Sequence, residues 1–429
     1  MKIAVIGTGY VGLSTGVGFA SKGNEVICVD IDKKKVEQVN KGVSPIYEPL
    51  LSEHLKKVLK EKKLRATDNL HEAIGKSEIV FVSVGTPSKE DGSIDLKYIE
   101  NVSKDIGRSL TNKGYKLIVV KSTVVPETTG KVVIPLLERY SGKKAGRDFG
   151  VCMNPEFLRE GKAMEDFLNP DRIVIGGIDK KSGNILERLY ENFDSKILRT
   201  DLKTAEMIKY ASNAFLAIKI SFSNEIGNVC KRLGIDVYDV MKGVGLDKRI
   251  SPHFLRAGAG YGGSCFPKDV DALVRKAKDL KYEPRLLEEV QDLNRRQKVG
   301  MVDLLERKIG DLKGKEICVL GLAFKPDTDD IRGASSVEIL SKLTEKGAKV
   351  RAYDPKAEGN TRRIFPDVDY TENVKDAIKG SDACLIVTEW EEFRKLEDKD
   401  FKKMRSKIII EGRKILDPTK VTGFEGICW

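Results

Sequence analysis

The feature that most constrains this chain is a glycine pattern close to its N-terminus. Gly7-Thr8-Gly9-Tyr10-Val11-Gly12 follows an apolar, strand-like segment at 2–6 and opens a helical pattern at 11–22. A second strand-like segment then ends at Asp30. Glycines in the spacing G-x-G-x-x-G allow a tight turn, close approach of a pyrophosphate and close packing of helix on strand. The segment therefore predicts a βαβ unit that binds a dinucleotide at a helix N-terminus.

The acid at the end of the second strand indicates which dinucleotide binds. The Asp30 carboxylate can accept hydrogen bonds from both ribose hydroxyls, and its charge would repel a 2′-phosphate. This favours NAD over NADP as the cofactor. FAD is an alternative, because flavoproteins share the same glycine fingerprint.

The apolar periodicity predicts an α/β chain with two similar halves. Strand and helix patterns alternate to about residue 190, which predicts a doubly wound parallel sheet. A long helical run without proline follows at 200–235, and helical patterns continue to about 309. A second α/β unit starts near Lys315. We predict two Rossmann-like doubly wound domains joined by a central all-α region with a long helix. The predicted domains are 1–195, 196–310 and 311–429.

Composition narrows the classes of partner. The chain has 76 Lys and Arg against 65 Asp and Glu among 429 residues, and the excess is not concentrated in blocks. This favours anionic small ligands and argues against a nucleic-acid partner. No apolar run reaches the 18 residues of a membrane helix, so we expect no membrane partner. The seven cysteines form no C-x-x-C pair, so we expect neither disulfides nor a metal site. We also expect the protein to be cytoplasmic.

One cysteine differs from the others in its surroundings. Cys265 follows the glycine-rich segment 258–263 and precedes Lys268 and Asp269. A loop of this composition can fold closely around a ligand, a cation would favour the thiolate, and a carboxylate could act as a base. Cys265 is therefore a candidate nucleophile. The remaining cysteines are interpreted as small buried apolar residues.

Motifs along nearly the whole chain resemble one enzyme family. They are Gly7–Gly12, Lys121-Ser122-Thr123-Val124-Val125-Pro126, Asn154-Pro155-Glu156-Phe157-Leu158-Arg159-Glu160-Gly161, Lys209-Tyr210-Ala211-Ser212-Asn213, Gly262-Gly263-Ser264-Cys265-Phe266-Pro267-Lys268-Asp269 and Gly321-Leu322-Ala323-Phe324-Lys325. In this order they resemble the UDP-glucose/GDP-mannose dehydrogenase family of nucleotide-sugar dehydrogenases. The loop Gly260-Tyr261-Gly262-Gly263-Ser264-Cys265 is similar to that of the UDP-glucose branch.

The resemblance implies a four-electron oxidation of UDP-glucose to UDP-glucuronate with two NAD+ and one water. In the family, a thiohemiacetal and then a thioester form on the matching cysteine. Alternatives are a dehydrogenase of GDP-mannose or of a UDP-N-acetylhexosamine, and a two-electron dehydrogenase of the 3-hydroxyacid type. A further alternative is a protein that binds NAD without catalysis. The two-electron enzyme would need neither Cys265 nor the C-terminal domain.

Catalytic roles follow from the matched motifs. Cys265 would attack the aldehyde, Lys209 would stabilise the oxyanion, and Asp269 would act as base with a water held by Thr123. Glu156 or Asp269 would activate the hydrolytic water. Asn213 lies one helical turn from Lys209, so that the two share a face.

The resemblance also implies which residues bind each ligand. It assigns NAD contacts to Gly7, Gly9, Val11, Gly12, Asp30, Lys35, Thr86, Thr123, Glu160, Lys268 and Arg332. It assigns substrate contacts to Glu156, Phe157, Leu158, Arg159, Glu160, Lys209, Asn213, Arg249, Phe254, Leu255, Arg256, Ala257, Gly258, Gly262, Lys325 and Arg413. The C-terminal domain would bind the UDP-sugar, and the central helices would form a homodimer. In the family, the arginine that matches Arg249 reaches the substrate of the neighbouring subunit. Three places depart from the family pattern: Gly85 after Val84, Gly333 after Arg332, and Glu411-Gly412-Arg413-Lys414.

Overall fold

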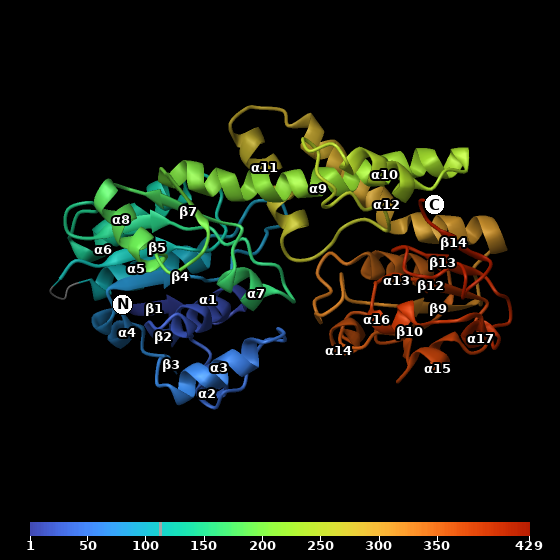
Figure 1. Cartoon of the computed structure of the whole chain (residues 1–429), viewed down its shortest axis with the longest axis horizontal. Helices are drawn as coiled ribbons and strands as arrows, with labels where there is room; N and C mark the ends of the chain where they lie inside the picture. Colours follow the sequence, from blue (N-terminus) through green and yellow to red (C-terminus); the bar gives the residue numbers. More distant parts are fainter. Residues whose placement is uncertain (111–113) are drawn as a thin grey trace. The chain divides into compact units, whose positions relative to one another are not determined.

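The chain forms two compact units, each built on a sheet. A computed structural model describes residues 1–110 and 114–429, and these divide into Met1–Ser212 and Asn213–Trp429 (Figure 1). The helix α9 (Leu202–Leu233) begins in the first unit and ends in the second. Among the described residues, no helix is both long and apolar enough to cross a lipid bilayer.

The first unit contains an eight-stranded sheet in the order β3-β2-β1-β4-β5-β6-β7-β8. Its strands are β1 (Lys2–Ile6), β2 (Glu25–Val29), β3 (Leu64–Thr67), β4 (Ile79–Val82), β5 (Leu117–Val120), β6 (Gly150–Met153), β7 (Arg172–Gly177) and β8 (Lys196–Thr200). The first six strands have the Rossmann order, which confirms the predicted doubly wound plan.

One pair of strands departs from the parallel sheet expected for this segment. β6 and β7 pair antiparallel, with Cys152 opposite Gly177 and Met153 opposite Gly176. The connection between them contains only the six-residue helix α7 (Ala163–Leu168). At 1.5 Å per residue such a helix rises only about 9 Å, so it does not return the chain along a full strand as a parallel crossover does.

Helices cover both faces of this sheet because successive strand residues point to opposite sides. Ile3 and Val5 belong to one buried core, and Ala4 and Ile6 belong to another on the opposite face. The helices of this unit, besides α7 and α9, are α1 (Tyr10–Ser21), α2 (Lys33–Asn40), α3 (Leu51–Lys60), α4 (Leu70–Lys76), α5 (Lys97–Ser109), the π-helical turn η1 (Thr129–Val133), α6 (Ile134–Ser141) and α8 (Lys180–Leu189).

The second unit joins helices to a six-stranded parallel sheet in the order β11-β10-β9-β12-β13-β14. The strands are β9 (Glu316–Leu320), β10 (Lys349–Tyr353), β11 (Asp369–Tyr370), β12 (Ala383–Ile386), β13 (Ile409–Glu411) and β14 (Phe424–Gly426). Numbered from β9, this is again the Rossmann order, as predicted.

Three helices follow α9 before this sheet, as the sequence indicates. They are α10 (Val237–Gly245), α11 (Phe266–Asp279) and α12 (Arg285–Ile309), and Figure 1 shows α12 beside α13 (Ser335–Glu345), against which it packs. The remaining helices are α14 (Glu358–Arg362), α15 (Val374–Ile378), α16 (Glu391–Arg394) and α17 (Asp398–Phe401).

Candidate active site

The glycine fingerprint forms the turn between β1 and α1 that the sequence predicts. Gly7 has φ +95°, and a Cβ placed on it would lie 2.5 Å from the carbonyl oxygen of Ser83. A Cβ on Gly12 would lie 1.9 Å from the carbonyl oxygen of Gly7. Both glycines are therefore required by the packing of the turn itself.

Gly9 and Asp30 instead leave room for a ligand at this turn. A Cβ on Gly9, the residue before α1, would have no atom within 4 Å. The partly exposed Asp30 carboxylate accepts hydrogen bonds from Thr8 and from the backbone N–H of Asp32. Burial raises the pKa of Asp30, but these hydrogen bonds and the charge of Lys35 outweigh it, and the net shift is downward. An open helix N-terminus beside an ionised acid fits NAD.

Two further predicted NAD residues meet at the ends of neighbouring strands. Thr86, in the loop after β4, donates from its hydroxyl to the carbonyl oxygen of Thr123, in the loop after β5 (3.0 Å). Because ligands of doubly wound sheets bind outside the carboxyl ends of the strands, both threonines lie at the expected edge.

A buried ion pair joins two of the predicted catalytic residues. The Lys209 ammonium, on α9, lies 2.9 Å from Glu156 Oε1, and Oε2 of Glu156 accepts from the backbone N–H of Leu158. Only 3% of Lys209 and 6% of Glu156 is exposed. Burial raises the pKa of Glu156, but Lys209 and the Leu158 N–H more than offset this, so the net shift is downward. The ion pair offsets the cost of burying a charged lysine, which would be high for an unpaired ammonium.

A second buried lysine near this pair was not predicted. Lys121 Nζ donates to Asn154 Oδ1 (3.0 Å), and the Tyr190 hydroxyl donates to the same oxygen (2.6 Å). Burial lowers the pKa of Lys121 to about 8, although the charge of Glu156 opposes this. The apolar strand that ends at Lys121 was the available signal, since a lysine there must be buried.

Two buried glutamates, also not predicted, hold the loops that carry the predicted residues of the first unit. Glu206, on α9, accepts from the backbone N–H groups of Glu127 and Thr129 (2.6 and 2.7 Å), shortly after Thr123. Glu48 accepts from Gly161 and Ala163 (2.8 and 2.7 Å), directly after the 156–160 segment.

The second unit brings three other predicted residues together around Asp269. The Asp269 carboxylate is 1% exposed and accepts from Asn213 Nδ2 (2.6 Å) and from the Lys268 ammonium (2.5 Å). Cys265 immediately precedes α11, and its carbonyl oxygen accepts from the Asp269 N–H, so the two lie one helical turn apart. Cys265 is partly exposed, whereas the other six cysteines are buried, and all seven are free thiols.

The loop before Cys265 approaches the C-terminal α/β region closely. A Cβ on Gly258 would lie 2.3 Å from the carbonyl oxygen of Gly412 and 3.3 Å from the Arg413 guanidinium. A Cβ on Gly262 would lie 2.3 Å from the carbonyl oxygen of Gly333, and Gly263 donates to the carbonyl oxygen of Arg332. Predicted substrate and NAD residues that are far apart in sequence are therefore neighbours here.

Other predicted residues lie at the surface or in structural pairs. Arg332 pairs with Asp330, Arg159 with Asp166, and Arg249 with Asp247; these arginine side chains are 61%, 57% and 89% exposed. Arg413 donates to the carbonyl oxygen of Val387 (3.2 Å). Arg256 is exposed and Val11 is partly exposed, whereas Leu255 and Ala257 are buried. The ring of Phe157 lies under the Arg172 guanidinium, and Lys325 lies near the ring of Phe324. Leu158 packs at the edge of the first core, and Phe254 lies near Phe266.

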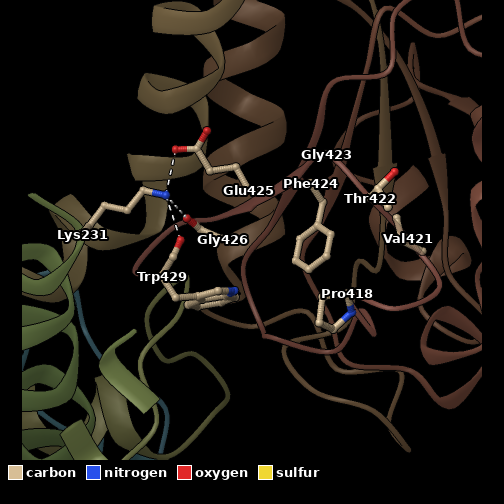
Figure 2. Close-up of a pocket in the computed structure, with 9 residues that line it drawn as sticks. All are labelled: Lys231, Pro418, Val421, Thr422, Gly423, Phe424, Glu425, Gly426 and Trp429. Carbon is tan, nitrogen blue, oxygen red and sulfur yellow. Dashed lines mark hydrogen bonds and ion pairs between the residues drawn. The ribbon is translucent and has the colours of Figure 1, made fainter. Parts of the chain in front are cut away.

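A surface pocket elsewhere in the second unit contains none of the predicted residues. Figure 2 shows it beside Lys231, whose ammonium binds the Glu425 carboxylate and the carbonyl oxygens of Gly426 and Trp429. The lysine is thus engaged in holding the segment of β14 and the residues after it.

Comparison with known protein families agrees with the interpretation of both units. Residues 1–194 match the NAD binding domain of the UDP-glucose/GDP-mannose dehydrogenase family, 203–296 match its central domain and 318–418 its UDP binding domain. The chain belongs to this family. Its first sheet, with the open turn at Gly9, is therefore the NAD-binding domain of a nucleotide-sugar dehydrogenase fold.

Similar proteins cover the full length of the chain. It is 46% identical to UDP-glucose 6-dehydrogenase TuaD of Bacillus subtilis, over 99% of this chain and 92% of the relative. It is 43% identical to UDP-glucose 6-dehydrogenase AglM of Haloferax volcanii, over all of both chains. A solved UDP-glucose dehydrogenase from Pyrobaculum islandicum superposes with a TM-score of 0.95 at 41% identity, covering 100% of this chain and 97% of that one.

Proposed function

We propose that the protein oxidises UDP-glucose to UDP-glucuronate, with reduction of two NAD+ and consumption of one water. Support comes from the UDP-glucose dehydrogenases that match the chain over its full length. The observation that carries the proposal is the grouping of a partly exposed Cys265, the buried Asp269 carboxylate, Asn213 and Lys268 in the second unit.

The first unit would hold the cofactor. The residues proposed to bind NAD include Asp30 for the ribose, the N-terminus of α1 for the pyrophosphate, and Thr86 and Thr123. When bound, NAD+ supplies a hydride acceptor for each of the two oxidations.

The chain's own residues would move the protons and stabilise the charges of the alcohol oxidation. Asp269, with a water held by Thr123, accepts the proton of the C6 hydroxyl. Lys209 stabilises the negative charge that develops on that oxygen, because a buried ammonium interacts strongly in a medium of low polarity.

Cys265 would hold the aldehyde so that it is not released. Its sulfur adds to C6 and a proton goes to the carbonyl oxygen, which gives a thiohemiacetal. Loss of a hydride and a proton from this adduct gives a thioester, and water then cleaves the C–S bond. The products are the C6 carboxylate and the free thiol. Glu156 or Asp269 accepts the proton of the attacking water.

The decisive experiment counts NADH. With limiting UDP-glucose and excess NAD+, the protein should form about two NADH per sugar and release UDP-glucuronate. One NADH per sugar would place the end of the reaction at the aldehyde and contradict the role of Cys265. Turnover with GDP-mannose or a UDP-N-acetylhexosamine instead would change the proposed substrate. If none of these nucleotide sugars gives NADH, the proposal that the protein is an enzyme is contradicted.

A matched pair of cysteine variants tests the thiol. Cys265→Ser should abolish multiple turnover, whereas Cys230→Ser, at a buried cysteine of α9 with no proposed role, should keep the two-to-one stoichiometry. Full turnover by Cys265→Ser would favour a two-electron dehydrogenase.

We also propose a homodimer through the central helices. Phe215, Phe222, Val229 and Leu233 on α9 are each 47% exposed or more. Their spacing of seven, seven and four residues places them along one stripe of the helix, and an exposed apolar stripe favours a second copy. Phe222→Asp should shift the mass measured by light scattering towards a monomer, and an unchanged mass would contradict this interface.

The cytoplasm is the proposed location. All seven cysteines are free thiols, which fits a reducing compartment. Fractionation of the source cells should recover the protein with the cytoplasmic fraction, and recovery outside the cell would contradict this assignment.

A further inference from the structure

The loop that leads to Cys265 is held mainly through its backbone. Four of the residues from Gly258 to Gly263 are glycines, so this segment has few side chains with which to anchor itself. A Cβ on Gly260, which has φ +81°, would lie 2.7 Å from Asn294 Oδ1. The loop is therefore packed closely against α12 as well as against the C-terminal α/β region.

Buried carboxamides from two helices hold the backbone of Gly258. Asn224 Oδ1, on α9, accepts from the Gly258 N–H (2.8 Å), and Gln297 Nε2, on α12, donates to the Gly258 carbonyl oxygen (2.8 Å). Asn224 is 0% and Gln297 4% exposed. Both polar groups of one glycine are thus satisfied by side chains from different helices.

A third carboxamide holds the backbone of Tyr261 in the same manner. Asn294 Oδ1, on α12, accepts from the Tyr261 N–H (2.8 Å), and Asn294 Nδ2 donates to the Tyr261 carbonyl oxygen (3.0 Å). Asn294 is 5% exposed. A carboxamide offers a donor and an acceptor on one planar group, so the single side chain of Asn294 can bind both backbone groups of Tyr261.

The contacts with the loop backbone lie close to Cys265 in the sequence. Tyr261 lies four residues before Cys265, and Cys265 is the residue that precedes α11. The N-terminus of a helix favours a negative charge next to it, and this effect falls off within one turn. A small displacement of the loop therefore moves the sulfur relative to the helix end and to Asp269.

We propose that Asn224, Asn294 and Gln297 are positioning residues that set the orientation and reactivity of the Cys265 thiol. They act through the backbone of the loop at Gly258 and Tyr261. The inference rests on the proposed function in one respect, the role of Cys265 as nucleophile.

The main test compares two asparagine variants that lose the same kind of contact. Asn294→Ala removes both bonds to Tyr261. Asn40→Ala removes an equivalent pair in the first unit, where Asn40 binds the N–H and the carbonyl oxygen of Ala66. The readouts are kcat, KM, the affinity for NAD+, and the rate of Cys265 alkylation by iodoacetamide between pH 6 and 10. Mass spectrometry of the Cys265 peptide follows the alkylation.

Asn294→Ala should lower kcat about 10- to 100-fold, because a misplaced reacting group reacts slowly. It should also move the pH midpoint of Cys265 alkylation upward, since the thiolate loses its place at the helix end. The affinity for NAD+ should match that of the wild type, and Asn40→Ala should keep the wild-type kcat and alkylation profile. An unchanged kcat and an unchanged alkylation profile in Asn294→Ala, with only a lower melting temperature, would overturn the proposal.

A second variant covers the case in which Asn294→Ala does not fold. Gln297→Met keeps the length and volume of the side chain but removes the donor to Gly258. It should shift the alkylation profile in the same direction by a smaller amount, and an unshifted profile would overturn the proposal. If the wild type reduces no NAD+ with any nucleotide sugar, the proposed function fails, while the alkylation arm still tests whether these residues control the thiol.

Discussion

The two sheets place an aspartate at the same point and use it differently. Asp30 follows β2 and Asp354 follows β10. Each accepts a hydrogen bond from the second residue after β1 or β9, the residue that comes after a glycine. These glycines, Gly7 and Gly321, have φ values of +95° and +94°. Up to this point the two turns are built alike.

The difference lies in what else binds each carboxylate. Asp354 is 4% exposed and accepts from four backbone N–H groups and from the indole of Trp390. Asp30 is partly exposed, and within the described part of the chain its hydrogen bonds come from Thr8 and Asp32. The same structural position therefore carries an acid proposed to bind the cofactor in one unit and a fully hydrogen-bonded structural acid in the other. Fold alone does not separate the two.

The largest effect that tests this contrast is expected for Asp354→Ala. The substitution leaves several buried donors without an acceptor, so the free energy of unfolding should fall by about 3–5 kcal/mol. Affinity for NAD+ should not change, because Asp354 is not among the residues to which NAD contacts are assigned. Urea denaturation and an NAD+ titration measure the two quantities. A loss below about 1 kcal/mol would show that water replaces the carboxylate easily.

The paired glycines should behave alike despite the different roles of the two aspartates. A Cβ on Gly7 would meet the Ser83 carbonyl oxygen at 2.5 Å, and one on Gly321 would meet Thr388 Cβ at the same distance. Both also have positive φ, so Gly7→Ala and Gly321→Ala should each cost about 2–4 kcal/mol of stability. Thermal or urea unfolding of the two variants checks this, and a large difference between them would break the parallel.

Gly9→Ala should separate ligand binding from folding. The second unit already has an alanine at the matching position, Ala323, and a Cβ on Gly9 meets nothing within 4 Å. The free energy of unfolding should therefore change by less than about 1 kcal/mol, whereas affinity for NAD+ should fall about tenfold or more. Calorimetric titration with NAD+ measures the affinity. Unchanged binding would show that the pyrophosphate does not approach Gly9.

The smallest expected effect concerns pH. The folded pKa of Asp30 is lowered, so its contribution to stability is present above the unfolded value of about 3.9 and is lost as the pH falls through the folded value. The stability difference between the wild type and Asp30→Asn should be constant from pH 8 to 5 and shrink below about pH 4. Urea midpoints at a series of pH values measure it. A difference that grows on acidification would reverse the sign of the pKa shift.

Sequence reasoning predicted the parts of the molecule in which a local pattern carries the information. The G-x-G-x-x-G turn, the acid at the end of β2 and the long α9 all follow from spacing or from apolar periodicity. The antiparallel β6–β7 pair was missed because the short helix between these strands resembles an ordinary crossover in sequence.

The residues that hold the loops could not be predicted from local patterns. Glu48 and Gly161 are 113 residues apart, and Glu206 and Glu127 are 79 apart. Asn224, Asn294 and Gln297 are single polar residues within helices, which are usually solvent-facing. Only the path of each loop shows which backbone N–H and C=O groups lack a partner in their own segment and need a side chain from elsewhere.

The position of Glu206 on α9 has a consequence for dissecting the protein into fragments. A recombinant NAD-binding piece ending at residue 194, where the family match ends, would lack β8 and leave β7 as an open edge. It would also lack the carboxylate that caps Glu127 and Thr129. A fragment that ends after Ser212 keeps both. A fragment that keeps both features therefore has to include the beginning of a helix that continues into the second unit.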